Sequence, residues 1–129
     1  GSIIVWNKAF EGNVNKRMAE LCPEHSAYCL NMNTRYYDLM VIFQNQWYAH
    51  PDFKGSYSIK KVLPVLVPEL SYKEMEVGEG ATAMVTWKRL AFEQDVEAVE
   101  KKRLQEAMLS YCKMDTFAMV RIWKNLASI

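Results

Sequence analysis

Tyr111 and Asp115 are a pair of residues whose types and spacing suggest chemistry. They stand four positions apart in the segment YCKMDTFAM, among cysteine, methionine and alanine. On a helix this spacing places the two side chains one above the other. A carboxylate on a partly apolar helix needs solvent, a polar partner or a metal ion. Taken alone, the segment favours a surface aspartate beside a packed tyrosine.

A second candidate segment is WNKAFE at residues 6–11, where an apolar run meets a helical pattern. Asn7 is a good helix N-cap, and Glu11 follows it by one position more than a capping box requires. Ligands of open α/β folds bind at the carboxyl ends of strands, where Asn7 and Glu11 would stand. The competing interpretation, which is favoured for this segment alone, is a solvated glutamate in the first turn of a helix.

One strand followed mostly by helices is predicted to position these residues. The run IIVW at residues 3–6 is β-branched and apolar, as expected of a strand covered on both faces. Helical periodicity then continues up to Pro23, through Phe10, Val14, Met18 and Leu21. A second, buried helix is predicted over about residues 24–45, which include the segment RYYDLM and its Asp38.

The rest of the chain is predicted to form a loop and three helices. Residues 47–58 carry proline, glycine and several aromatics, which indicates a loop. A short or kinked helix containing prolines is expected after Ser58. The turn EVGEG then precedes helices at about residues 81–92 and 95–127. Because no linker or repeat divides the chain, we interpret residues 3–129 as a single domain.

The start of the chain suggests a piece of a longer domain. Gly1 and Ser2 are interpreted as a cloning scar, and the apolar strand begins directly after them. One strand cannot form a sheet by itself, so we expect upstream strands that this chain lacks. We expect its exposed edge to be covered by another copy, which would make a homo-oligomer through the N-terminal strand, by rearranged helices, or by crystal neighbours.

Composition excludes some classes of protein. The net charge of +1 does not indicate wholesale electrostatic binding to nucleic acid, so any such contact must be local. Three cysteines without a CxxC pair indicate reduced thiols, which predicts a cytoplasmic protein. No apolar run approaches the roughly 18 residues that span a bilayer, so no membrane partner is expected.

Together the candidate segments resemble a known pattern. A strand ending in N-x-x-F-[DE], a helix with an Asp-Leu pair and a late Y-x-x-x-D helix are similar to the tyrosine-type DEDD 3′–5′ exonucleases. Nearly the whole chain also resembles an uncharacterised bacterial family of unknown function. The matching text is WNKAFE, RYYDLM, HPDFKGSYSIKKVLPVLVP and YCKMDTFAM.

The exonuclease resemblance implies an α/β, RNase H-like fold by descent. This chain would be a mostly α-helical, C-terminal part of it, with one N-terminal strand and one or two further short strands. Glu11, where the family normally has aspartate, and Asp115 would be carboxylate ligands of Mg²⁺ or Mn²⁺. Tyr111 would orient the attacking water, and Asn7 would position the strand–helix turn or the substrate. Asp38 would have a supporting or structural role.

The family's first motif, Asp-x-Glu on an early strand, does not occur after any strand-like run of this chain. Two of the four carboxylates are therefore missing, and the chain alone is expected to be inactive and to bind no metal. The intact protein is expected to hydrolyse the ends of single-stranded DNA or RNA. The alternative is a non-catalytic helical module that binds nucleic acid or a protein partner.

Two further segments contain side chains that could bind a ligand. The stretch of residues 47–61 interleaves aromatics with lysines, which suits contact with a single strand and predicts substrate binding by Tyr57, Lys54 and Lys60. Equally, its aromatics could pack on the core while its lysines stay solvated. A zinc site could be assembled from Cys22, His25, Cys29 and His50. Its spacing matches no closed zinc module, so buried thiols are favoured.

Overall fold

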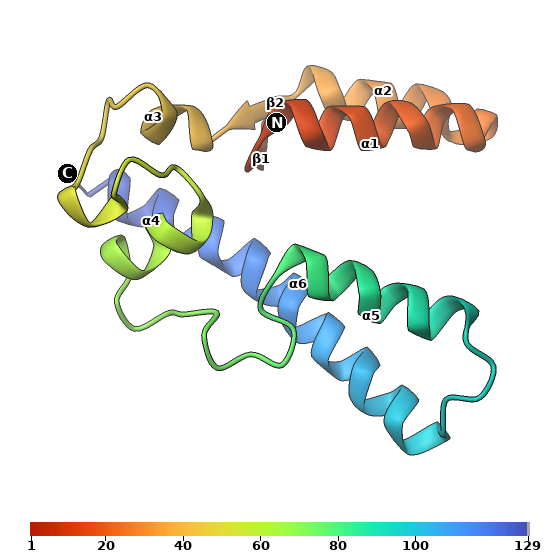
Figure 1. Cartoon of the computed structure of the whole chain (residues 1–129). Coiled ribbons are helices and arrows are strands. Elements are labelled where there is room, and N and C mark those ends of the chain that lie inside the picture. Colours follow the sequence, from red (N-terminus) through yellow and green to blue (C-terminus); the bar gives the residue numbers. More distant parts are fainter. Residues whose placement is uncertain (129) are drawn as a thin grey trace. The chain divides into compact units, whose positions relative to one another are not determined.

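Two short strands pair in parallel near the start of the chain (Figure 1). In the computed structural model, which describes residues 1–128, β1 (Ile3–Val5) lies beside β2 (Tyr36–Asp38), and Val5 stands opposite Asp38. The predicted N-terminal strand is confirmed, and so is a mostly helical chain with a further short strand. Val5 is buried, whereas the rest of β1 is only half-buried, so the expected cover on both faces is incomplete.

The predicted helix over residues 24–45 is wrong. Three elements occupy this range: α2 (Ser26–Thr34), β2, and the short helix α3 (Met40–Gln44). Aromatic residues such as Tyr36 and Tyr37 fit a strand as well as a helix. The hydrogen bonds of the parallel ladder to β1 decide the conformation, and this long-range pairing has no local signal in the sequence.

Two helices lie between the two strands in sequence and pack against each other (Figure 1). α1 (Lys8–Leu21) ends before Pro23, as predicted, and the 3₁₀ turn η1 (Pro23–His25) leads into α2. The Asn15 side-chain amide donates to the Asn33 side chain (2.9 Å) and to the Tyr36 hydroxyl (2.6 Å). The predicted apolar stripe of α1 is exposed, at Phe10, Val14, Met18 and Leu21.

An aromatic cluster lies beyond α3. Phe43 is 5% exposed and stacks on Trp6, with ring centroids 5.5 Å apart. The rings of Tyr48 and Phe53 meet Phe43 edge-on, at 6.0 Å and 5.8 Å. Phe53 belongs to the 3₁₀ turn η2 (Pro51–Phe53), so the cluster fixes the fold of the loop predicted here.

The elements after this loop match their predictions closely. α4 (Ile59–Leu66) is short and begins after Ser58, whose carbonyl accepts from the Val62 amide. α5 (Gly80–Phe92) and α6 (Ala98–Leu126) correspond to the two predicted late helices, although α6 begins three residues later than expected.

Residues 1–65 and 66–128 form two compact units. In the second unit, Arg89 of α5 pairs with Glu100 of α6 at 2.8 Å. Arg103 and Arg121 of α6 pair with Glu76 and Glu69 of the segment before α5. The interpretation of residues 3–129 as one domain stays a prediction, and its last residue lies outside the described range.

No helix within residues 1–128 combines the length and the apolar character needed to cross a membrane.

Candidate functional site

Asp38 joins the carboxyl ends of the two strands. Its Oδ1 accepts hydrogen bonds from the backbone N–H groups of Asn7 (3.0 Å) and Met40 (3.1 Å). Its Oδ2 accepts from the N–H of Lys8 at 2.7 Å. A carboxylate at the positive end of a helix is stabilised by the unpaired N–H groups there. Asp38 thus lies at a strand end, not on a helix as predicted, and its contacts are those of a structural residue.

Asn7 caps α1, as the sequence predicts. Its side-chain oxygen accepts from the N–H of Phe10 at 3.2 Å, and its backbone adopts a left-handed conformation with φ 73°. Glu11 lies one turn further on, half-buried on α1, and its N–H donates to the Asn7 carbonyl. Asparagine adopts the left-handed conformation of Asn7 more readily than most other non-glycine residues.

A pocket of about 580 Å³ opens where the two strands end. Three of the predicted substrate-binding residues, Asn7, Lys54 and Tyr57, line this strand-end pocket. Lys60 lies on α4 and does not line it. The other lining residues are Trp6, Met40, Gly55, Ser56, Ser58 and Ile59. Residues far apart in sequence therefore meet at the edge of the sheet where α/β proteins bind ligands.

The aromatic loop has both a packed and an exposed aromatic side chain, and its binding of a single strand stays a prediction. Phe53 is 5% exposed and packs in the core, whereas Tyr57 is 43% exposed. Lys54 and Gly55 have left-handed backbones, with φ 51° and 75°. The loop is therefore anchored by one aromatic and presents another to solvent beside a lysine.

The second unit contains a tyrosine–aspartate cluster on α6. The hydroxyl of Tyr72 donates to Asp115 Oδ1 at 2.8 Å, and the rings of Tyr72 and Tyr111 lie 6.2 Å apart. Tyr72 is 6% exposed. Tyr72 has no signal in the sequence that marks it as a site residue, because its segment has no periodic pattern and the contact spans 43 positions.

Both phenols of this cluster hold their protons tightly. Burial, together with the charge and hydrogen bonding of Asp115, raises the pKa of Tyr111 to about 12. Burial and the hydrogen bond to Asp115 raise the pKa of Tyr72 as well. At neutral pH, Tyr111 is therefore a neutral O–H group that can orient a ligand or water but cannot act as a base.

The predicted site residues fall in both units. Asn7, Glu11 and Asp38 belong to residues 1–65, and Tyr111 and Asp115 belong to residues 66–128. Within the described residues, no group of three or more His, Cys, Asp and Glu side chains is arranged to hold a metal ion. Metal binding by Glu11 and Asp115 stays a prediction. Cys29 is buried as a free thiol, the interpretation favoured over a zinc site.

Part of the chain matches the model of a family of unknown function. Residues 1–58 match the model of the family described as Domain of unknown function (DUF2779). The chain is similar to Uncharacterized protein UU173 of Ureaplasma parvum serovar 3, with 33% identity over 138 residues. The match covers 94% of this chain but 20% of that protein, so the chain spans about a fifth of the relative's length. No solved structure matches the chain significantly.

Proposed function

We propose that this chain is part of a metal-dependent 3′–5′ exonuclease that acts on the ends of single-stranded nucleic acid. The observation that carries the proposal is the strand–helix junction, where Asn7 and Glu11 follow directly on a parallel strand. Asp38 closes this junction from the neighbouring strand. Carboxyl ends of parallel strands are the usual place for ligand binding in α/β proteins. The resemblance to the DEDD pattern supplies the reaction.

Glu11 and Asp115 would hold Mg²⁺ or Mn²⁺, ions that prefer carboxylate oxygens. Asp115 fits this role, because a carboxylate has about four lone-pair sites and the Tyr72 hydroxyl occupies one of them. The bound ions would supply a hydroxide nucleophile and stabilise the charge of the transition state.

The residues of the tyrosine–aspartate cluster would hold the reacting groups in place. Tyr72 fixes the orientation of the Asp115 carboxylate through its buried hydroxyl. Tyr111, protonated at neutral pH, would donate a hydrogen bond to the attacking water or to a phosphate oxygen. In the first unit, Lys54 and Tyr57 of the strand-end pocket would contact the phosphate backbone and a base.

The test is release of nucleotides from a 5′-labelled single-stranded oligonucleotide by the full-length protein with Mn²⁺. Wild type is expected to shorten the strand stepwise, and Asp115→Ala to abolish shortening. Asp95→Ala, an exposed aspartate of the same unit, is the matched control and should remain active. Failure of the wild type to shorten DNA or RNA would refute the proposal.

A second candidate is a non-catalytic module that binds nucleic acid or a protein partner. It is favoured by one observation, the engagement of Asp115 by Tyr72, which gives the carboxylate a structural use without a metal. Binding of single strands without shortening in the same assay would support this candidate.

A further inference from the structure

A second pocket lies in the first unit, on the other side of the aromatic loop. It has a volume of about 490 Å³, within the range of small-ligand sites. Tyr57 is the one predicted substrate-binding residue among the described residues that line it. We propose that this aromatic pocket receives one unstacked nucleobase of a single-stranded nucleic acid. The inference rests on the proposed function, because it names a part of the same substrate.

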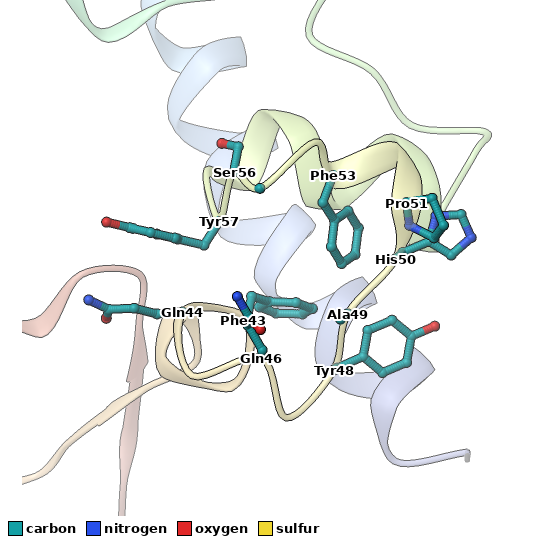
Figure 2. Close-up of a pocket in the computed structure, with 11 residues that line it drawn as sticks. Phe43, Gln44, Gln46, Tyr48, Ala49, His50, Pro51, Phe53, Ser56 and Tyr57 are labelled. Atoms are coloured by element: carbon teal, nitrogen blue, oxygen red, sulfur yellow. The ribbon is translucent and has the colours of Figure 1, made fainter.

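The walls of the aromatic pocket have the chemistry that a base requires. Figure 2 shows the segment with Ser56 and Tyr57 opposite the segment with Gln44 and Gln46, and the Phe53 ring above the Phe43 ring. Aromatic faces stack on bases of any sequence, and amide side chains can donate to and accept from base edges. None of the described residues that line the aromatic pocket is Lys, Arg, Asp or Glu, so the pocket suits the uncharged base better than the phosphate.

His50 adds a hydrogen-bond donor to the pocket, the N–H group of its Nε2. Its Nδ1 accepts from the backbone N–H of Asp52 at 3.2 Å. In the neutral ring the proton must then lie on Nε2. His50 lines the aromatic pocket and can offer this N–H to a base carbonyl or ring nitrogen.

The backbone of the loop is built in conformations that cost free energy. Gln46, Lys54 and Gly55 have φ values of 57°, 51° and 75°. A left-handed backbone is uncommon for residues other than glycine, asparagine and aspartate, and so for Gln46 and Lys54. Gln46 lines the aromatic pocket and Lys54 precedes the loop residues Gly55 to Tyr57, so their left-handed backbones indicate a loop shape that is maintained at a cost in stability.

The aromatic pocket and the strand-end pocket share a wall. Gly55, Ser56 and Tyr57 line both of them, while Lys54 lines the strand-end pocket alone. A single strand could therefore place a base against Tyr57 in the aromatic pocket and its phosphate near Lys54. This arrangement provides stacking and charge on adjoining surfaces, as single-strand sites generally do.

The test measures equilibrium binding of a fluorescein-labelled oligothymidylate to the full-length protein in EDTA at fixed low salt. Tyr57→Ala is expected to weaken binding roughly 5- to 100-fold, the range for loss of one base stack. Tyr57→Phe keeps the ring and should bind within about twofold of wild type. Tyr28→Ala removes an exposed tyrosine of the same unit, 65% exposed and outside both pockets, and should also bind like wild type.

A second arm replaces the bases by abasic sites on the same sugar–phosphate chain. Loss of affinity comparable to that of Tyr57→Ala would support the proposal, and Tyr57→Ala should then have no further effect. Equal binding of abasic and normal strands, or unchanged binding by Tyr57→Ala, would overturn it. Full competition by thymidine monophosphate at the same concentration as the strand would assign the pocket to a free nucleotide and also overturn it.

This test separates the two proposals because it needs no catalysis. Base-dependent binding without strand shortening would retain the aromatic pocket and refute the exonuclease. Strand shortening with unchanged binding by Tyr57→Ala would retain the exonuclease and refute the aromatic pocket.

Discussion

The Tyr72 hydroxyl donates a 2.8 Å hydrogen bond to Asp115 across 43 positions of sequence. The contact ties an irregular segment of the second unit to helix α6. Tyr72 is buried and Asp115 is half-buried, so the phenol shields one side of the carboxylate while the other remains reachable. Any chemistry of Asp115 must operate around this contact.

Replacement of Tyr72 by phenylalanine tests the strength of this contact. The ring remains, and Asp115 loses one charge-assisted hydrogen bond, which is typically worth about 1.5–3 kcal/mol. Because Asp115 is half-buried and water can replace the phenol in part, we expect a loss of about 1–2 kcal/mol in the free energy of unfolding. Urea denaturation of Tyr72→Phe would measure it. Tyr28→Phe, at an exposed position, is the control, and equal stability of Tyr72→Phe and wild type would contradict the assigned bond.

The raised tyrosine pKa values predict how stability depends on pH. Folding favours the protonated phenol, so the contribution of Tyr111 is fully present below the unfolded pKa of about 10. It is lost as pH rises from there through the folded value of about 12. Stability should therefore fall over this interval, and less steeply in Tyr111→Phe. Urea midpoints at several pH values would show it, and identical slopes for Tyr111→Phe and wild type would refute the assignment.

Removal of the Asp38 carboxylate should loosen the strand–helix junction. Asp38→Ala leaves three backbone N–H groups to solvent, and loss of a comparable helix cap costs about 0.5–2 kcal/mol. Asp38→Asn retains an acceptor and should cost less. Asp52→Ala is the control for a loss of charge at an exposed site. Urea denaturation gives the comparison, and full stability of Asp38→Ala would show that the junction forms without this residue.

Replacement by alanine is expected to have opposite effects on stability at two glycines. At Gly78 an added Cβ would lie 2.7 Å from the backbone carbonyl oxygen of Tyr72, so Gly78→Ala should destabilise by about 1–3 kcal/mol. At Gly12, within α1, the nearest atom belongs to the Asn33 side chain at 3.6 Å. Gly12→Ala should therefore stabilise by about 0.5–1 kcal/mol through helix propensity. Thermal unfolding distinguishes the two, and a stable Gly78→Ala would contradict the close approach.

Local signals explain which elements the sequence predicts well. Asn7 and Pro23 bound α1, and the turn EVGEG marks the start of α5, so the positions of these helices follow from the chain itself. The strand at Tyr36–Asp38 depends on pairing with residues more than thirty positions away. The apolar pattern of its own segment also fits a helix. Long-range contacts override local propensity here.

The candidate site also contains some residues that the sequence indicates and some that only the fold identifies. Asn7 and Tyr57 are recognisable by type, because a strand–helix junction and an aromatic–lysine loop have local patterns. Their convergence on the strand-end pocket requires the fold. Tyr72 has no pattern at all, since a tyrosine in an irregular segment becomes informative only through the partner that it meets.

The central claim is that the full-length protein is a metal-dependent exonuclease whose activity needs the carboxylates of Glu11 and Asp115. The most direct measurement is the rate of single-strand shortening by the full-length protein with Mn²⁺, compared between wild type, Glu11→Gln and Asp115→Asn. Each change should lower the rate by at least about 100-fold. Wild-type rates for Asp115→Asn or for Glu11→Gln would contradict the claim.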